Sequence, residues 1–279
     1  MMDRLFVIGL GFCGLEIARR AKANGWQVAG SVTGEGKADE LRSKGIEAEL
    51  LSVSSRALQA ATHILSTVPP QASGDPVLPL VRELRPTWLG YISTTGVYGD
   101  RGGGWVDETD TPNPGQARSR HRLQAERAWH DLARERGAPL DVFRLPAIYG
   151  PGRSALDQVR EGRAQCVDKP GQVFCRVHVA DIASAVLAAM KQARGTLYNV
   201  CDDEPCAQSD VIAFACKLLG RPAPRLVPWE EAAPKMSEMA RSFYAENRRV
   251  RNDRIKRELG VRLQFPTYRE GLTAIASAN

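Results

Sequence analysis

The sequence predicts an α/β protein built on a doubly wound parallel sheet. Apolar runs of strand length alternate with amphipathic stretches of helix length over about the first 150 residues, and repeated β-α units of this kind form parallel sheets with right-handed crossovers. Strand runs that are apolar throughout, such as residues 5–8, suit a sheet covered on both faces. A glycine-rich turn directly after that first run is the third observation that favours this fold class.

Short strands and helices are predicted in alternation along the chain. Strands are predicted from apolar runs of strand length at residues 5–8, 27–32, 48–51, 63–68, 88–94 and 140–145. Helices are predicted from the amphipathic stretches between them, at residues 15–23, 38–43, 56–61, 77–84 and 116–136. After Pro146 the alternation loosens, and the remaining predictions are helices at 155–161 and 182–192 and strands at 173–179 and 196–200. From Pro205 onward Pro and Arg are frequent and the helices are expected to be short.

The glycine-rich turn matches the pattern G-x-G-x-x-G, which gains meaning here because it follows an apolar strand and opens a helix. Gly9 allows the tight turn, Gly11 lets a pyrophosphate approach the backbone, and Gly14 lets helix and strand pack closely. The phosphates then lie at the positive end of the helix. The turn therefore predicts a Rossmann-type dinucleotide site, with Phe12 and Cys13 among its contacts.

The cofactor is predicted to be NADP, with NAD kept as the alternative. An NAD site places a carboxylate about 20 residues after the loop to bind the ribose hydroxyls. The second predicted strand instead ends in Gly-Ser-Val-Thr, without a carboxylate that would repel a 2′-phosphate. Ser31 and Thr33 are expected to donate to that phosphate, and Lys37 to supply charge. Thr67, at the end of the fourth predicted strand, is expected beside the ribose and nicotinamide.

Four later stretches form a specific combination: STTGVYG at residues 93–99, RLPAIYGPGR at 144–153, RVHVADIA at 176–183 and LYNV at 197–200. Together they resemble the extended short-chain dehydrogenase/reductase family, which includes sugar-nucleotide epimerases and dehydratases. The resemblance implies hydride transfer to or from a nicotinamide, with Pro146 among the residues beside the cofactor.

The catalytic helix departs from that family. Its members use a Tyr as general acid/base, a Lys four residues later that lowers the Tyr pKa, and a Ser or Thr hydroxyl that polarises the carbonyl. Thr94 matches the Ser/Thr position, but Arg118 stands at the Tyr position and Arg122 at the Lys position. A guanidinium stays protonated and cannot replace the phenol, whereas Arg122 can hold the cofactor ribose or phosphate. The helix is similar to an atypical, YeeZ-like branch of the family that lacks the Tyr/Lys pair.

Several residues are candidates for the proton donor. His121 lies on the same helix, and histidine is the residue type best suited to acid/base work at neutral pH, although a surface histidine on a basic helix is the simpler interpretation. Tyr98 and Tyr149 are phenols near the same sheet edge, for which packing is the simpler interpretation. Asp107 and Glu108 follow a run of glycines, and a solvated loop or turn explains them.

Basic residues further along the chain suggest an anionic substrate. In relatives that take sugar nucleotides, basic groups in these regions face the substrate phosphates, and a planar guanidinium pairs two oxygens at once. Arg153 and Arg176 are therefore predicted to contact the substrate, together with Thr95. The alternative for Arg176 is a salt bridge to Asp181 or to surface carboxylates, and His178 is interpreted as structural. Residues 247–252, which resemble a stretch of the atypical branch, are expected to close the pocket.

Composition and charge exclude several classes. The chain has 279 residues, and no apolar run reaches the roughly 18 residues that a membrane span needs. The N-terminus leads straight into a strand without an apolar signal region, so we expect a cytoplasmic protein with no membrane partner. Six cysteines are too sparse for a disulfide framework, and no metal site is predicted. Residues 217–262 hold twelve Lys and Arg against six Asp and Glu, without the interleaved aromatics of a single-strand binder, so no nucleic-acid partner is predicted.

These observations divide the chain into a Rossmann domain at 1–150, with 179–203 returning to it, and a small α+β substrate cap at 151–178 and 204–279. The first functional hypothesis is an NAD(P)-dependent oxidoreductase or epimerase-like enzyme for a small polar substrate that is phosphorylated or nucleotide-linked. In it, Thr94 polarises the reacting oxygen and His121 or a water supplies the proton.

The second hypothesis is an NAD(P)-binding regulator or redox sensor that has lost the Tyr/Lys chemistry. Because relatives pair through two long helices, a homodimer through the Arg-rich helix 116–136 is a further hypothesis.

Overall fold

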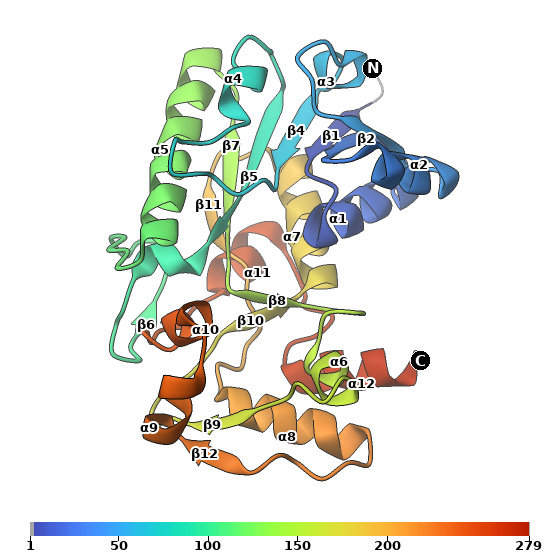
Figure 1. The fold of residues 1–279 in the computed structure, drawn as a ribbon. Coiled ribbons are helices and arrows are strands. Elements are labelled where there is room, and N and C mark those ends of the chain that lie inside the picture. The colour runs from blue at the N-terminus through green and yellow to red at the C-terminus, as the bar shows by residue number, and fades with distance from the viewer. Residues whose placement is uncertain (1–2, 279) are drawn as a thin grey trace.

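A seven-stranded parallel sheet forms the centre of the larger domain (Figure 1). The computed structural model describes residues 3–278. The strand order is β11-β7-β5-β4-β1-β2-β3, so the sheet grows outward in both directions from the point between β1 and β4, where open α/β sheets bind their ligands. The strands are β1 (Arg4–Ile8), β2 (Gln27–Val32), β3 (Glu47–Leu50), β4 (His63–Ser66), β5 (Trp88–Thr94), β7 (Leu140–Leu145) and β11 (Leu197–Asn199).

Helices cover both faces of this sheet, which separates two hydrophobic cores (Figure 1). In β1, Leu5 and Val7 face one core, whereas Phe6 and Ile8 face the other, as the two-residue period of a strand requires. The first core is covered by α1 (Phe12–Ala23), α2 (Glu35–Ser43), α7 (Val179–Gln192) and α11 (Asp253–Leu259). The second is covered by α3 (Arg56–Gln59), α4 (Leu78–Val81) and α5 (Ala117–Arg136). The predicted doubly wound Rossmann fold is confirmed.

Most predicted elements of the larger domain lie where the sequence placed them. The bounds of β2, β5 and β7 agree with the prediction. The helix α1 begins three residues earlier than predicted, because the chain enters the helix directly after Gly11. The helix α7 also begins three residues early, with the imidazole of His178 accepting the N–H of Ala180 as its cap. The strand predicted at 173–179 is shorter, and only residues 176–178 form β10 (Arg176–His178).

The smaller cap packs around a third hydrophobic core that includes Tyr149, Leu156, Ile212 and Leu272. That core lies between α6 (Ala155–Arg160), α8 (Gln208–Leu218) and α12 (Tyr268–Ser277). Short parallel pairs complete the cap, namely β8 (Ala147–Tyr149) with β10, and β9 (Cys166–Asp168) with β12 (Leu226–Pro228). The segment after β12 forms α9 (Trp229–Ala232), η2 (Ala233–Lys235) and α10 (Glu238–Phe243).

Two C-terminal segments leave the cap and pack on the larger domain. The helix α11 buries Ile255 and Leu259 in the first sheet core and contacts α7, although the sequence places the whole stretch 204–279 in the cap. The strand β13 (Arg249–Val250) pairs with β6 (Trp105–Val106), in the loop that follows the 3-10 helix η1 (Thr95–Tyr98). No helix within residues 3–278 is long and apolar enough to cross a bilayer.

A buried ion pair fastens α5 to the sheet. The carboxylate of Glu126 lies 2.7 Å from the guanidinium of Arg144 in β7, and each side chain is 5% exposed. The same carboxylate accepts the hydroxyl of Ser93 from β5. The pair therefore joins one helix to two adjacent strands within the hydrophobic interior.

Replacing Glu126 by Ala should destabilise the fold strongly, because it leaves the buried Arg144 guanidinium without its counter-charge. Removing one partner of a buried pair costs about 3–5 kcal/mol, and urea unfolding measures the loss. Glu135→Ala, an exposed position on the same helix, should change the free energy of unfolding by less than about 0.5 kcal/mol. A loss below about 1 kcal/mol for Glu126→Ala would contradict the role given to the pair.

Candidate functional site

The glycine turn between β1 and α1 has the shape and the donors that a pyrophosphate requires. Gly9 has φ +97°, and a Cβ there would lie 2.7 Å from the hydroxyl of Thr67. A Cβ on Gly14 would collide with the carbonyl oxygen of Gly9, so this position admits only glycine. Gly11 is the N-cap of α1, and no side chain of the described residues caps the helix. The N–H groups of its first turn are therefore available to an anion.

Two of the side chains predicted to contact the cofactor, Ser31 and Thr67, form hydrogen bonds to the backbone of the glycine turn. The hydroxyl of Ser31 accepts the N–H of Gly9 at 3.1 Å, and the hydroxyl of Thr67 donates to the carbonyl of Gly9 at 2.7 Å. Thr33 is exposed at the end of β2. Lys37 is also exposed, and its ammonium lies 2.7 Å from the carboxylate of Glu40. The preference for NADP stays a prediction.

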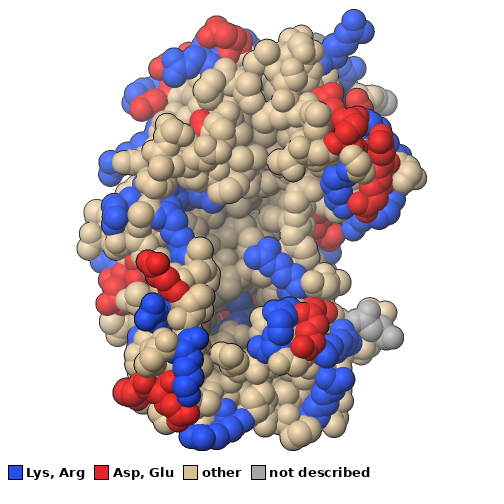
Figure 2. All heavy atoms as spheres, in the orientation of Figure 1, with Lys and Arg blue, Asp and Glu red and all other residues tan. Residues whose placement is uncertain are grey.

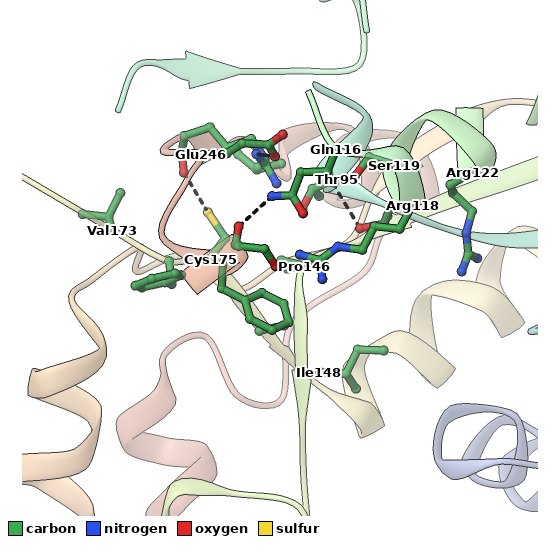
Figure 3. Close-up of a pocket in the computed structure, with 18 of the residues that line it drawn as sticks. Thr95, Gln116, Arg118, Ser119, Arg122, Pro146, Ile148, Val173, Cys175 and Glu246 are labelled. Atoms are coloured by element: carbon green, nitrogen blue, oxygen red, sulfur yellow. Dashed lines mark hydrogen bonds and ion pairs between the residues drawn. The ribbon is translucent and has the colours of Figure 1, made fainter. Parts of the chain in front are cut away.

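A cavity of about 360 Å³ lies where β5 ends and α5 begins, and we call it the Thr94 cavity. Thr94, Thr95, Arg122 and Pro146 line it, so the structure brings together four residues that the sequence singled out separately. Figure 3 shows Thr95 and Ser119 next to one another, with Arg118 and Arg122 extending from the same helix. Figure 2 shows a hollow across the middle of this face, with Lys and Arg side chains on both sides of it.

The hydroxyl of Thr94 is oriented by the backbone. It accepts the N–H of Gly96 at 3.1 Å and thereby caps η1. A hydroxyl that accepts one hydrogen bond keeps its own proton for donation. Thr94 is thus able to donate to an oxygen atom in the cavity, which is the role predicted for it.

Residues of α5 line the cavity on one side of the helix. Arg118, Ser119 and Arg122 face it and fall within about 100° of each other on a helix of 3.6 residues per turn. His121 lies about 60° outside that arc and lines neither this cavity nor the second one described below. The guanidinium of Arg122 donates to the carbonyl of Ile92 in β5.

Arg118, at the position of the family's Tyr, contacts the cap. Its guanidinium lies 4.5 Å from the centre of the Phe243 ring and 3.0 Å from the sulfur of Met239. Both partners belong to α10 and are more than half exposed. The side chain therefore bridges the two domains at the mouth of the Thr94 cavity, where a phenol would act in the family.

The cavity is strongly basic. Four guanidinium groups and one carboxylate line it, and Glu246 is paired with Arg248 at 2.8 Å. The other three are Arg118, Arg122 and Arg153, and no carboxylate of residues 3–278 forms an ion pair with any of them. Arg248 and Val250, which belong to the stretch 247–252, line this cavity, and the role of that stretch in closing the pocket stays a prediction.

A second cavity, of about 470 Å³, lies between β8, α6 and α12 and shares Arg153 with the first. Arg153 lies over the ring of Phe12, 5.4 Å from its centre, so this guanidinium also contacts the start of the cofactor turn. Arg176 lines the second cavity and is 5% exposed. It donates to the sulfur of Cys206 at 2.9 Å, while its Nη2 has no hydrogen-bond partner among the described residues.

Asp181 and His178 both have structural roles at the start of α7. Asp181 accepts the N–H groups of Gln264 and Phe265, so it does not pair with Arg176. His178 caps α7 and lies against two aromatic rings, and burial lowers its pKa to about 4. Within residues 3–278, no three His, Cys, Asp or Glu side chains gather in a way that would hold a metal.

The other candidate proton donors form hydrogen bonds outside the Thr94 cavity. Tyr98 is fully buried and donates to the amide oxygen of Asn199 at 2.8 Å. Tyr149 lines only the second cavity, and its hydroxyl donates to the carbonyl of Thr267 at 3.5 Å. Asp107 accepts the N–H and hydroxyl of Thr109 in a turn, and Glu108 accepts the N–H of Asn199. None of these groups lines the Thr94 cavity.

Sequence reasoning missed several lining residues, because nothing in their type or spacing marks them. Ser119, Gln116 and Cys175 are ordinary residues in their segments. The packing of α5 against η1 brings the first two to the cavity, and Cys175 reaches it from a buried cluster with Tyr98 and Val250. Burial raises the pKa of the Cys175 thiol to about 11. Phe243 and Glu246 come from a distant segment that folds back over the site.

The chain is similar to known proteins over most of its length. A model of the NAD dependent epimerase/dehydratase family matches residues 71–201, which include Thr94 and α5. The structure of a functionally unknown conserved protein from Silicibacter pomeroyi DSS is 43% identical, covers 99% of both chains and superposes with a TM-score of 0.91. Protein YeeZ of Escherichia coli K12 is 27% identical over 285 residues, which span 95% of this chain and 97% of that protein. A 3-diazoavenalumate denitrifying reductase from Streptomyces sp. is 30% identical over 172 residues, 58% of this chain and 55% of that protein.

The buried carboxyl of Asp202, near Arg176, should make stability depend on pH. Burial raises its pKa to about 8, while the charge of Arg176 lowers it. The unfolded carboxyl has a pKa of about 4, so the stabilisation is complete below pH 4 and is lost as the pH rises to about 8. Asp202→Asn cannot ionise. The free energy of unfolding of the wild type, relative to this variant, should therefore fall between pH 4 and pH 8.

Urea unfolding at several pH values measures this difference. Asp253→Asn, at an exposed position, is the matched control and should follow the wild type throughout. A constant difference between Asp202→Asn and the wild type over this range would rule out the buried carboxyl as the cause.

Proposed function

Because the chain belongs to the NAD-dependent epimerase/dehydratase family, we propose that it is an NAD(P)-dependent oxidoreductase that acts on a small anionic substrate in the Thr94 cavity. The observation that carries the proposal is the cavity itself. A backbone-oriented hydroxyl, Thr94, and three guanidinium groups without carboxylate partners among the described residues line it. One of the three, Arg153, lies over the ring of Phe12 at the start of α1, directly after the second glycine of the turn. The turn supplies the cofactor site, the hydroxyl a donor for the reacting oxygen, and the guanidinium groups a site for an anion.

The cofactor is held by the glycine turn. The first-turn N–H groups of α1, including those of Phe12 and Cys13, bind the pyrophosphate, and Gly11 leaves room for it because a Cβ there would meet no atom within 4 Å. When bound, the nicotinamide supplies or accepts a hydride. We assign the cofactor as NADP, since β2 ends without a carboxylate beside the ribose, with Ser31, Thr33 and Lys37 as the nearby donors.

The remaining residues position the substrate. Thr94 donates to the reacting oxygen, and Thr95 lies beside it in the same cavity. Arg122 lines the same cavity and donates to the carbonyl of Ile92 at the end of β5, and its guanidinium would hold the cofactor ribose or phosphate. Arg153 and Arg176, which line the adjoining second cavity, bind the anionic group of the substrate.

A second candidate function is supported by one specific observation. No Tyr or His of the described residues lines the Thr94 cavity, and Arg118 occupies the position of the family's phenol. A protein that binds NAD(P) without turnover, as a regulator or redox sensor, would show this pattern. It requires the glycine turn but not the hydroxyl of Thr94.

One experiment separates the two functions. The purified protein is titrated by calorimetry with NADPH, NADP, NADH and NAD, and the reduced complex is then offered a panel of 2-oxo acids, aldehydes, sugar phosphates and sugar nucleotides. Binding followed by cofactor oxidation supports the oxidoreductase. Binding without oxidation by any compound supports the regulator, and no binding of any nucleotide overturns both.

The glycine turn gives a sharp prediction about cofactor affinity. Gly11→Ala should fold with wild-type stability, because the new methyl group meets no protein atom within 4 Å and the backbone there has an ordinary negative φ of −79°. The same methyl group should obstruct the pyrophosphate and weaken NAD(P)H binding at least about tenfold, by roughly 1.4 kcal/mol. Calorimetric titration and urea unfolding measure the two effects separately.

Gly25→Ala serves as the comparison for a glycine outside the site, and its effect should be on stability alone, since Gly25 has φ +86°. Unchanged NAD(P)H affinity in Gly11→Ala would show that the pyrophosphate does not lie over this residue.

A further inference from the structure

The site as described has no proton donor of the family's kind. Arg118 replaces the phenol and is held by the cap through Phe243 and Met239. His121 lies outside the cavity. The next residue along α5 after Arg118 is Ser119, a neutral hydroxyl that the sequence gives no reason to single out.

Ser119 is placed to act on the same oxygen atom as Thr94. Its side chain is 4% exposed and lines the Thr94 cavity, and no hydrogen bond engages its hydroxyl within residues 3–278. A Cβ added to Gly96 would lie 2.7 Å from the hydroxyl of Ser119 and 3.3 Å from that of Thr94. The absence of a side chain at Gly96 therefore leaves both hydroxyls close to one point. Figure 3 shows Ser119 next to Thr95 at one side of the cavity.

Besides Thr94 and Ser119, the neutral hydroxyl and thiol groups that line the cavity are those of Thr95, Ser242 and Cys175. The hydroxyl of Ser242 donates to the carbonyl of Met239 at 2.7 Å, and Thr95 is proposed above to lie beside the substrate. The sulfur of Cys175 lies 3.8 Å from the carbonyl oxygen of Arg248, to which it donates, on the other side of the cavity from Ser119 (Figure 3). Burial also raises its pKa. Neither its partner nor its place directs this thiol toward Thr94.

We propose that Ser119 is a catalytic residue that, with Thr94, binds the reacting oxygen of the substrate and transfers the proton that the family's Tyr would transfer. This inference rests on the proposed function and assigns the donor for that same site. Thr94 keeps its proton in a hydrogen bond to the oxygen, while Ser119 exchanges its proton with it.

The charges on α5 favour this role. Arg122 follows Ser119 by three residues and is therefore its neighbour on the helix surface. Arg118 and Arg122 both line the same cavity as Ser119. A preorganised positive field stabilises negative charge that develops on oxygen. The guanidinium groups cannot supply the proton themselves, but they lower the energy of the alkoxide that receives it.

The proposed step balances in both directions. In reduction, the carbonyl carbon takes a hydride from the bound reduced dinucleotide, and the C=O π electron pair moves onto oxygen. The O–H bond of Ser119 breaks as its proton passes to that oxygen, and the serine oxygen takes a proton from water in the cavity. In oxidation, the alcohol proton passes to the serine oxygen, which releases its own proton to water, and the hydride returns to the oxidised dinucleotide.

The test compares the full-length wild type with Ser119→Ala, Ser119→Thr and Gly96→Ala, using NADPH or NADH and the carbonyl panel above. Each variant is characterised by kcat on the compound that the wild type reduces best, by the Kd of the reduced cofactor and by urea unfolding. Ser119→Ala should lose about 100-fold in kcat, the usual contribution of one positioned donor, while its cofactor Kd stays within about twofold. Ser119→Thr, which keeps a hydroxyl, should recover most of the rate.

Gly96→Ala should reproduce the loss in kcat, because its methyl group displaces the Ser119 hydroxyl. Ser184→Ala is the matched control: this serine donates to the carbonyl of Ala180 within α7, away from both cavities. It should keep the wild-type kcat.

Wild-type kcat in Ser119→Ala overturns the proposal, and so does a weakening of cofactor binding equal to the loss in kcat, which would indicate a structural role. A 100-fold loss in Cys175→Ala with full activity in Ser119→Ala overturns it in favour of the thiol. If the wild type reduces no compound, the proposed function itself fails, and the assignment of Ser119 fails with it.

Discussion

The site depends on how α5 is held against the sheet. Glu126 lies within the helix and joins Arg144 of β7 and Ser93 of β5 in the buried interior. One turn earlier, Arg122 donates to the carbonyl of Ile92 in β5. One turn later, the indole of Trp129 donates to Asp75 at 2.9 Å. Polar contacts of this kind have direction and length, so they fix the register of the helix more closely than apolar packing alone.

That register decides which side chains reach the cavity. With Glu126 fixed, the first turn of α5 lies over the end of β5, and residues 118, 119 and 122 face Thr94. The helical period alone places His121 outside the part of the helix surface that residues 118, 119 and 122 occupy. The same interaction that stabilises the interior thus selects the chemistry presented at the edge of the sheet.

The fold was predictable from the sequence because its signals are local. The strand at 88–94 and the turn after Ile8 are marked by apolar runs and glycine spacing that need no distant contact. Thr94 was predicted from the resemblance of residues 93–99 to the family, in which it matches the Ser/Thr position. The short strands β6, β8, β9 and β12 were not predictable, since each is two or three residues long and exists only because a distant strand pairs with it.

Ser119 shows where prediction from the sequence stops. Its hydroxyl reaches the cavity because Gly96 has no side chain and because α5 packs on η1. Neither fact can be predicted from the residues next to Ser119 in the sequence. The exchange of a phenol for Arg118 is readable from the sequence, but its consequence is spatial. The guanidinium of Arg118 lies on the Phe243 ring of the cap, while Thr94 and Ser119 line the same cavity with neutral hydroxyls. The residue that loses the family's chemistry is therefore held by the cap, and the proposed proton donor is its neighbour in the sequence.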